Sequence, residues 1–341
     1  MTPFDRSAAT RRSTGRPTMS DVATVAGVSL KTVSRVVNRE GTVQEATTAR
    51  VRAAVATLGF RRNDAASTLA RASAQALIGV VIEDVSDPFY SRLAGGIEQV
   101  ARDHGHLILL ASSQENSGLE RSATLALADR GVAGMIIVPH SKDHRYLEPE
   151  IRSGLHIVFV DRPPRLISAD AVLSDNVDGA RQGVAHLIDL GHTRIAFVGN
   201  DSSVYTSSRR LRGYRLAHAD AALTVDEQLV VRGPNTVEQA KDATLALLES
   251  SEPPTALFTQ NNLVTMGAWR AARLSGASID LVGYDDFAMA DVLDPPVTVV
   301  AQDPLALGRE AATLLFARLA GLTDPARRVI VPTRLIVRSR H

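Results

Sequence analysis

Five side chains that could make directed polar or apolar contacts fall on one short predicted helix near the N-terminus. Lys31, Arg35 and Asn38 recur at i, i+4 and i+7, and Leu30 and Ser34 stand beside them. Ammonium, guanidinium and amide groups can read the edges of base pairs in the major groove of DNA. The pattern predicts the second helix of a helix-turn-helix; an ordinary helical hairpin with a solvated basic face is the alternative.

The flanking residues predict how this helix is held. A first helix begins at Thr18 and ends at Gly27, a glycine suited to a left-handed helix end, and Ser29 caps the second helix. We expect buried stripes on both helices and on a third helix from Val43 to Leu58, which together make a small headpiece. The expected core residues are Met19, Val22, Val25, Ala23, Ala26, Val33, Val36, Val37, Val51, Val55, Leu58 and Phe60.

From Leu77 onward apolar strands alternate with helical segments, the alternation restarts after residue 176, and the run RVIVPTRLIVR near the end of the chain is expected to form one final strand. Such a pattern predicts parallel sheets covered on both faces, here in two similar halves with a cleft between them. Polar residues recur where the predicted strands end, and ligands of such sheets bind at those ends. The candidate ligand-binding residues are Phe89, Asp161, Arg162, Arg210, Asn261 and Asp285, with Asp87, Pro88 and Asn262 beside them. An Asp or Asn after a strand can also be a simple helix cap.

The charge is unevenly distributed. The 341 residues carry a net charge of +1, yet residues 1–75 carry a net charge of +7 and the remainder a net charge of −6. Basic charge gathered in one module is typical of a phosphate-binding surface attached to a domain that does not itself bind nucleic acid. The chain has no cysteine, no apolar run long enough to span a membrane and no secretory signal, so a cytoplasmic, nucleoid-associated protein is expected.

Several separate motifs, in order, resemble one family. The run DVATVAGVSLKTVSRVVN is followed by VRAAVATLGF, then by GHTRIAFVG and by LVGYDD. Together they are similar to the LacI/GalR transcriptional regulators over residues 18–341. The resemblance implies an α/β protein with an N-terminal three-helix helix-turn-helix headpiece plus hinge helix, then a two-lobed doubly wound effector domain like that of the periplasmic binding proteins.

The resemblance also implies boundaries and DNA contacts. We expect an arm over residues 1–17, a headpiece over 18–62, a hinge and linker over 63–75 and an effector-binding and dimerisation domain over 76–341. Its N-lobe covers about 76–172 and 304–331, and its C-lobe about 173–301 and 332–341. The family's hinge helices place a leucine in the minor groove, here Leu69, although a plain linker fits the same composition. The predicted DNA contacts are Thr18, Ser29, Leu30, Lys31, Thr32, Ser34, Arg35, Asn38, Asn63, Leu69 and Ala70.

The implied function is that of a repressor controlled by a small molecule. It would bind a near-palindromic double-stranded DNA operator as a homodimer, without a cofactor, metal or membrane. An arginine with carboxylates and amides suits a polyhydroxylated or anionic small molecule, so a sugar-like or nucleoside-like effector is expected. Relatives often have an aromatic residue against the ligand where this chain has Asn235, which weakens the prediction of a stacked ring.

Two other classes of protein, solute-binding proteins and enzymes, fit the sequence less well. A two-lobed solute-binding protein shares the expected fold, but the basic headpiece and the missing signal peptide argue against it. An enzyme is disfavoured because the chain has no P-loop and no GxSxG motif. His186, Asp189 and His192 resemble a metal motif, but His192 follows a glycine that ends a helix and is expected to face away from His186.

Overall fold

The computed structural model describes residues 19–38, 43–58 and 77–338. The chain divides into two compact units, Met1–Ser73 and Ala74–His341, and each is considered by itself. The predicted arm and hinge lie outside the described residues. So do Thr18, Phe60, Asn63, Leu69 and Ala70, and the side chains of Met19, Val37 and Asn38.

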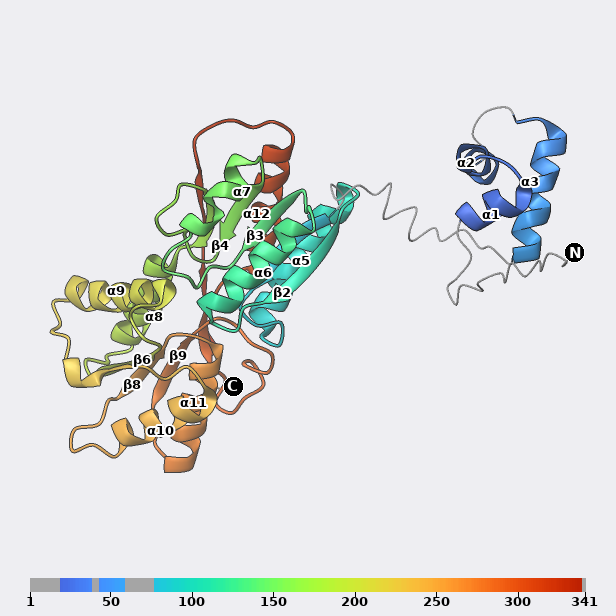
Figure 1. Cartoon of the computed structure of the whole chain (residues 1–341). Helices are drawn as coiled ribbons and strands as arrows, with labels where there is room; N and C mark the ends of the chain where they lie inside the picture. Colours follow the sequence, from blue (N-terminus) through green and yellow to red (C-terminus); the bar gives the residue numbers. More distant parts are fainter. Residues whose placement is uncertain (1–18, 39–42, 59–76, 339–341) are drawn as a thin grey trace, which may run out of the picture. The chain divides into compact units, whose positions relative to one another are not determined.

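In the first unit, residues 19–38 and 43–58 form three helices around a small apolar core (Figure 1). They are α1 (Met19–Ala26), α2 (Leu30–Asn38) and α3 (Glu45–Leu58). The buried residues of this core are Val22, Ala26, Val33, Val51 and Ala54, with Ala23, Val28, Val36, Val55 and Leu58 packed around them. The helical periodicity in the sequence therefore identified the core of all three helices.

Two details of the headpiece differ from the prediction. Val25 was expected in the core, but it is 53% exposed. The buried stripe of α1 runs instead through Val22 and Ala26, which are four residues apart and lie one above the other on a helix. The third helix begins at Glu45 rather than at Val43, because the carbonyl of Gln44 accepts its first turn's hydrogen bonds.

The second unit contains two sheets of six strands each, which we call the N-lobe and the C-lobe (Figure 1). The strand order is β11-β5-β4-β3-β1-β2 in the N-lobe and β12-β10-β9-β8-β6-β7 in the C-lobe. Every pairing is parallel except that of β10 with β12. The predicted pair of doubly wound halves is confirmed.

The elements of the N-lobe are β1 (Leu77–Ile82), α5 (Pro88–Asp103), β2 (Leu107–Ser112), α6 (Ser117–Asp129), β3 (Gly134–Ile137), α7 (Glu148–Arg152), β4 (His156–Val160), β5 (Asp170–Ser174), α12 (Pro304–Leu319) and β11 (Arg328–Val331). Those of the C-lobe are α8 (Asn176–Asp189), β6 (Ile195–Gly199), α9 (Tyr205–Asp220), β7 (Val230–Arg232), α10 (Val237–Leu248), β8 (Ala256–Thr259), α11 (Asn262–Ser275), β9 (Asp280–Tyr284), β10 (Thr298–Ala301) and β12 (Arg334–Ile336).

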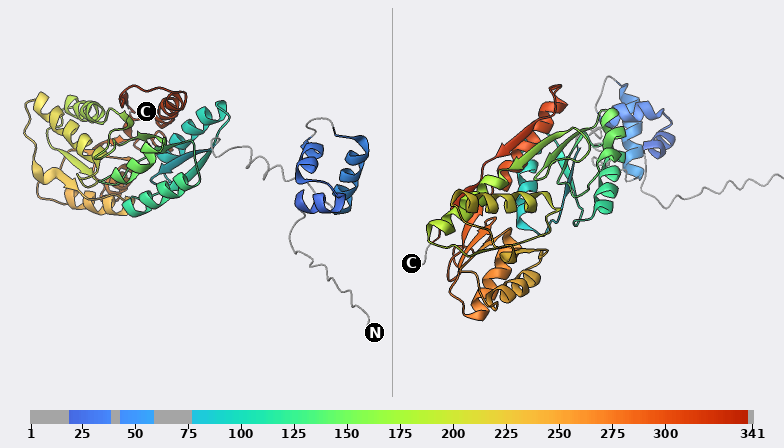
Figure 2. Two further views of the ribbon diagram at one scale, coloured as in Figure 1. Left: turned by 45° about the horizontal axis from the view of Figure 1, so that its top comes forward. Right: turned by 90° about the vertical axis from the view of Figure 1, so that its left-hand side faces the viewer.

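Helices cover both faces of each sheet (Figure 2). On one face of the N-lobe, Ile78, Val80 and Ile82 pack with α5 and α12. On the other face, Val81 and Met135 pack in a second cluster that includes Leu127 of α6. Two-sided burial explains the nearly continuous apolar runs of these strands, which are typical of parallel sheets.

The chain passes between the two lobes three times, and one passage corrects a prediction. The passages follow β5, β10 and β11. The segment RVIVPTRLIVR was expected to form one final strand, but it forms β11 in the N-lobe and β12 in the C-lobe. Pro332 lies between them and has no N–H to continue a ladder of hydrogen bonds.

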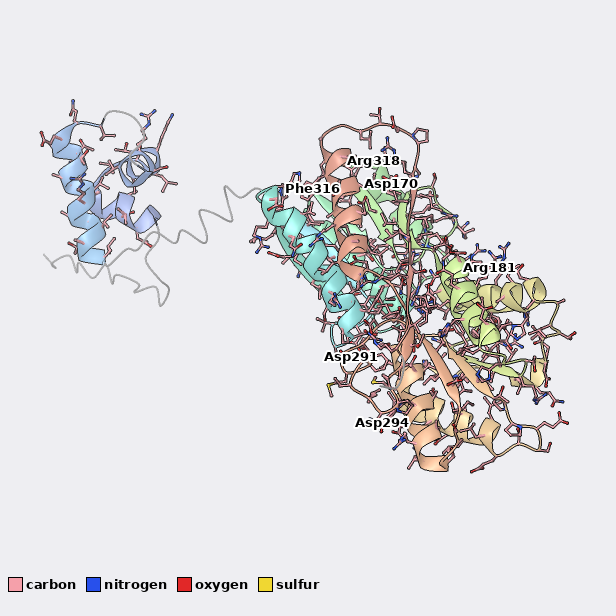
Figure 3. The ribbon with its side chains drawn as sticks, turned by 180° about the vertical axis from the view of Figure 1, so that it is seen from behind. Asp170, Arg181, Asp291, Asp294, Phe316 and Arg318 are labelled. Atoms are coloured by element: carbon pink, nitrogen blue, oxygen red, sulfur yellow. The ribbon has the colours of Figure 1, made fainter. Side chains whose placement is uncertain are left out.

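A partly buried ion pair joins α12 to the N-lobe sheet. Arg318 donates to both carboxylate oxygens of Asp170, at 2.7 and 2.8 Å, and to the carbonyls of Leu322 and Pro325 (Figure 3). The N–H of Arg327 donates to the same carboxylate at 2.7 Å. These bonds hold the turn that brings β11 beside β5.

Helices α5 and α12 cross closely, and adjacent glycines of α5 provide a test of that contact. A methyl group on Gly96 would overlap the backbone carbonyl of Leu305, whereas one on Gly95 would meet only the tip of the Leu305 side chain, at 3.9 Å. We expect Gly96→Ala to lower the free energy of unfolding by about 1–3 kcal/mol through overpacking. Gly95→Ala should raise it by about 0.5–1 kcal/mol because alanine is the better helix former. Urea unfolding of the two variants measures both; equal effects would contradict the packing described.

Candidate functional site

The turn between α1 and α2 fixes the start of α2. Gly27 has φ +63°, in the left-handed region, and the N–H of Val28 donates to the carbonyl of Ala23 at 3.1 Å. The hydroxyl oxygen of Ser29 accepts from the N–H of Thr32 at 3.1 Å, so Ser29 caps α2 as predicted. This turn sets the direction of α2 against the headpiece core.

One face of α2 is buried and the opposite face is open. Val33 is fully buried, whereas Leu30, Lys31 and Arg35 are exposed, Leu30 to 55%. Ser34 is half-buried beside them. A large apolar side chain held in water next to two cations is available for contact with a partner.

Two of the predicted DNA contacts also have a structural task. The hydroxyls of Ser29 and Thr32 lie 2.8 Å apart, at the capped end of α2. Each is therefore occupied within the headpiece. The predicted contacts Thr18, Asn38, Asn63, Leu69 and Ala70 involve side chains outside the described part of the chain.

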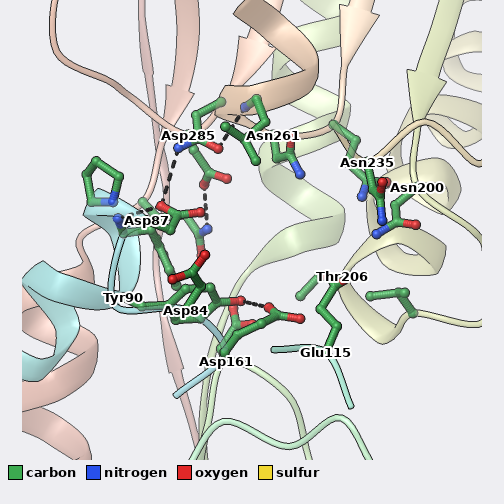
Figure 4. Close-up of a pocket in the computed structure, with 18 of the residues that line it drawn as sticks. Asp84, Asp87, Tyr90, Glu115, Asp161, Asn200, Thr206, Asn235, Asn261 and Asp285 are labelled. Atoms are coloured by element: carbon green, nitrogen blue, oxygen red, sulfur yellow. Dashed lines mark hydrogen bonds between the residues drawn. The ribbon is translucent and has the colours of Figure 1, made fainter. Parts of the chain in front are cut away.

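A cavity of about 490 Å³ lies between the N-lobe and the C-lobe, at the carboxyl ends of strands from both sheets (Figure 4). All six predicted ligand-binding residues line it, namely Phe89, Asp161, Arg162, Arg210, Asn261 and Asp285. They come from five different segments, because Asp161 and Arg162 are consecutive residues after β4. The prediction that polar strand ends meet in one cleft is thus met by the fold.

The same device occurs in both lobes at Asp161 and Asp285. Each follows a strand directly, after β4 and β9 respectively, and each has a positive φ, of 67° and 68°. The N–H of Asp161 donates to Val172 and that of Asp285 to Val300, both at 2.9 Å. Aspartate tolerates this conformation better than most residues, and the backbone bond keeps each carboxylate at the cavity.

Arg210 of α9 is held by the C-lobe from several sides. Its Nε donates to Asn176 at 2.7 Å, its Nη1 donates to the carbonyl of Gln260 at 2.6 Å, and its guanidinium lies 3.7 Å over the ring of Tyr284. Nη1 also lies 3.4 Å from the Asp285 carboxylate. The guanidinium is therefore oriented before any ligand arrives.

Arg162, which follows Asp161, is the buried arginine that lines the cavity from the N-lobe. Its Nη2 donates to Glu83 at 2.7 Å, its Nη1 donates to the same carboxylate at 3.3 Å, and the hydroxyl of Tyr90 also donates to it. Burial favours the neutral acid of Glu83, but the charge of Arg162 together with hydrogen bonds from Glu115, Tyr90 and Arg162 outweighs burial and holds the pKa of Glu83 below its usual range. The positive charge of Arg162 is thus already paired with the Glu83 carboxylate.

A second glutamate lies beside Glu83 with an unusual backbone. Glu115 and the preceding Gln114 have φ of 52° and 50°, a conformation that costs energy for residues with a side chain. Burial, then the hydrogen bond to Glu83 and repulsion by it, raise the pKa of Glu115 to about 7. Burial also raises the pKa of Asp161 to about 6, although Arg162 opposes it. Glu115 and Asp161 therefore ionise less readily in the cavity than ordinary carboxylic acids do in water.

Part of the cavity wall was not predicted from the sequence. Glu83 and Asp84 line the cavity from the loop after β1, Tyr90 from α5, and Gln114 and Glu115 from the loop after β2. An acidic pair directly after the run LIGVVI was the available signal for Glu83 and Asp84. Nothing in the local sequence marks Glu115, because its placement depends on the left-handed turn.

Other amides and hydroxyls complete the lining. Asn235 is among them, at the position where an aromatic residue was missing, together with Asn200, Thr206, Thr236, Gln260 and Gln302. The suspected caps Asp87 and Asn261 do cap helices, accepting from Phe89 and Val264 at 2.8 Å, and they line the cavity as well. Capping and lining are therefore compatible for these two side chains.

The suspected metal motif does not assemble. His192 contacts Thr255 through Nδ1 and Asp280 through Nε2, at 3.0 and 2.8 Å. Within residues 19–38, 43–58 and 77–338, no group of three or more His, Cys, Asp or Glu residues has metal-binding geometry. No helix in the same ranges is long and apolar enough to cross a membrane.

Two family models cover almost all of the described chain. Residues 18–63 match the model of the bacterial regulatory proteins of the lacI family, and residues 75–339 match that of the periplasmic binding proteins and sugar binding domain of the LacI family. The chain belongs to the LacI family. It is a DNA-binding transcriptional regulator. It has the helix-turn-helix and the two-lobed domain that the sequence motifs predicted.

Individual relatives agree over nearly full length. The regulator CelR of Thermobifida fusca is 33% identical over 333 residues, covering 95% of this chain and 98% of the relative. A solved complex of the transcriptional regulator CelR with cellobiose has a TM-score of 0.70 at 30% identity, covering 95% of this chain and 99% of that one. The lac repressor dimer, solved with operator and the anti-inducer ONPF, has a TM-score of 0.76 at 27% identity over the same shares.

The raised pKa of Glu115 makes a prediction for stability. Because its pKa in the folded state lies above the ordinary value, Glu115 stabilises the fold at low pH, and that contribution is lost as pH rises through about 7. We expect Glu115→Gln to melt at a higher temperature than the parent at about pH 8 and at nearly the same temperature at about pH 5. Glu249→Gln, on the exposed end of α10, is the control and should show no such trend. A melting difference for Glu115→Gln that does not change with pH would contradict the assignment.

Proposed function

We propose that this regulator is a repressor that binds a near-palindromic operator as a homodimer, and that a small molecule in the cavity between the lobes controls operator affinity. The observation that carries the proposal is the open face of α2, where Leu30, Lys31 and Arg35 are exposed opposite a fully buried Val33. The operator-bound lac repressor dimer and the CelR–cellobiose complex, both similar over 95% of this chain, support it. We assign operator binding to residues 18–62, hinge function to 63–75 and effector binding to 76–341.

The division of tasks on α2 follows from exposure and chemistry. A guanidinium can bind the O6 and N7 of guanine with two parallel hydrogen bonds, an ammonium binds phosphate or base as a point charge, and a leucine can contact a thymine methyl group. We assign base recognition to Arg35 with Leu30 and Lys31 beside it. Ser29, Thr32 and Ser34 hold the start of the helix or contact the DNA backbone.

The cavity supports control by a small molecule. Its walls come from both lobes, so a ligand that contacts both favours one arrangement of the lobes over another. We assign the effector contacts to residues of both lobes. Those of the C-lobe are Arg210, Asp285 and Asn261, and those of the N-lobe are Phe89, Asp161 and Arg162. In a two-fold dimer such a change would alter the spacing of the paired headpieces.

A two-lobed solute-binding protein without a regulatory role is the alternative that this proposal replaces. It would account for the cavity, but residues 18–63 match the bacterial regulatory proteins of the lacI family, and the exposed basic face of α2 would have no function in it. The two functions differ in whether the chain recognises a DNA sequence.

Substitution of Arg35 tests the assignment of base recognition. We expect Arg35→Ala to weaken binding to a preferred symmetric duplex by about 1–3 kcal/mol and to change binding to a scrambled duplex much less. Arg35→Lys keeps the charge but not the two parallel hydrogen bonds, so it should lose most of the same preference. Arg102→Ala, on the surface of α5 beside Glu98, is the control and should bind like the parent. Fluorescence anisotropy measures all four proteins; an equal loss on both duplexes would make Arg35 a phosphate contact.

A further inference from the structure

The side chains that line the cavity carry more negative than positive charge. Six carboxylic acids line it, namely Glu83, Asp84, Asp87, Glu115, Asp161 and Asp285, against two guanidinium groups, Arg162 and Arg210. The described lining includes no lysine and no histidine. Two cations cannot neutralise six carboxylates, so the empty cavity has an excess of negative charge wherever those groups are ionised.

The two arginines are already engaged with protein groups. Arg162 makes two hydrogen bonds to Glu83 and lies 3.4 Å from Asp161. Arg210 donates to Asn176 and Gln260 and faces Asp285. An anionic ligand would have to compete with these carboxylates for each guanidinium, and removing a buried partner from an ion pair is costly.

Two side-chain oxygens at the cavity accept no hydrogen bond from the described residues. The side-chain oxygen of Gln260, a residue 3% exposed, is buried without a hydrogen-bond partner among the described residues. So is that of Gln302, whose amide nitrogen already donates to Asp285 at 2.6 Å. Buried acceptors without donors are uncommon in folded proteins. The Nε donor of Arg162 is likewise buried without a hydrogen bond among the described residues. These unpaired groups are independent of the carboxylate count, and they point to a ligand that supplies both donors and acceptors, as hydroxyl groups do.

Glu115 is the lining acid whose pKa is raised the furthest, to about 7. It lines the cavity beside Glu83 of the N-lobe. Asn235 of the C-lobe lines the same cavity (Figure 4). The carboxyls of Glu83 and Glu115 can remain in contact when they share a proton. A ligand ammonium carries donors and a positive charge, so it can take the place of that proton and bind both acids.

We propose that the effector is a polyhydroxylated amine, such as an amino sugar, whose ammonium binds Glu115 and Glu83 and whose hydroxyls bind the surrounding amides. This inference rests on the proposed function, because it presumes that the cavity holds the effector. Asn200, Asn235 and Asn261 offer both donors and acceptors to hydroxyls. Phosphorylated sugars and sugar acids are disfavoured, because they add negative charge to a cavity in which six carboxylic acids face only two guanidinium groups.

The test compares ligands that share one skeleton and differ in charge. Glucosamine, N-acetylglucosamine, glucose and glucose 6-phosphate form one set, and the corresponding galactose and mannose compounds form two more. Calorimetric titration of the full chain should show binding by an amine in at least one set, at least about tenfold tighter than its neutral and phosphorylated partners, as expected for one close charge pair. Glu115→Gln should reduce that preference by about tenfold or more, whereas Glu249→Gln should keep it.

The possible outcomes separate this inference from the proposed function. Equal or tighter binding by a neutral or phosphorylated partner overturns the inference, and so does the absence of amine binding in all three sets. Preference for the amine that survives in Glu115→Gln also overturns the assigned position. Operator recognition is measured on the same preparation: a chain that recognises an operator but binds no amine refutes only the inference, whereas a chain that recognises no DNA sequence refutes the proposed function.

Discussion

The balance of charge where the two lobes meet is the constraint on which the second unit depends. Each lobe ends a central strand with an aspartate in the left-handed conformation, Asp161 in one and Asp285 in the other. Each lobe also supplies one buried arginine, Arg162 or Arg210, that is fastened to its own lobe. Six carboxylic acids from the two lobes nevertheless face the shared cavity against these two arginines, and a ligand that neutralises the excess negative charge favours the lobes coming together.

The three passages of the chain make the two lobes one unit while leaving the cavity open between them. Because β11 and β12 are separated only by Pro332 and Thr333, the last passage joins the edges of the two sheets directly. The ion pair of Arg318 with Asp170 fixes α12 and β11 to the N-lobe. The connections thus restrict how the lobes can move, which allows one bound ligand to select between a small number of arrangements.

The fold was largely predictable because its periodic patterns are strong. Alternating strands and helices gave the two wound halves, and the turn at Gly27 with the cap at Ser29 gave the headpiece. The errors arose where tertiary packing decides between similar side chains: Val25 fits the helical period yet faces solvent. The split of the last strand depends on which sheet each half joins, and local pattern does not contain that information.

The cavity was predicted in outline and missed in its charge. Strand ends identified Asp161, Arg162, Arg210 and Asp285, because parallel strands bring their carboxyl ends to one edge. Glu115 was missed, because it enters the cavity through two consecutive left-handed residues that no sequence pattern announces. The sequence therefore predicted an arginine-bearing polar site, whereas the assembled site is dominated by carboxylates.

The most direct test of the account is the selection of a binding site by the full chain. A pool of randomised duplexes would be enriched by binding at two salt concentrations and sequenced, with affinity followed by fluorescence anisotropy. We predict enrichment of one two-fold symmetric motif, whose half-sites are read by the exposed face of α2 in each copy of a dimer. Binding that is sensitive to salt but enriches no sequence would contradict the account, since contacts to phosphate alone produce that result.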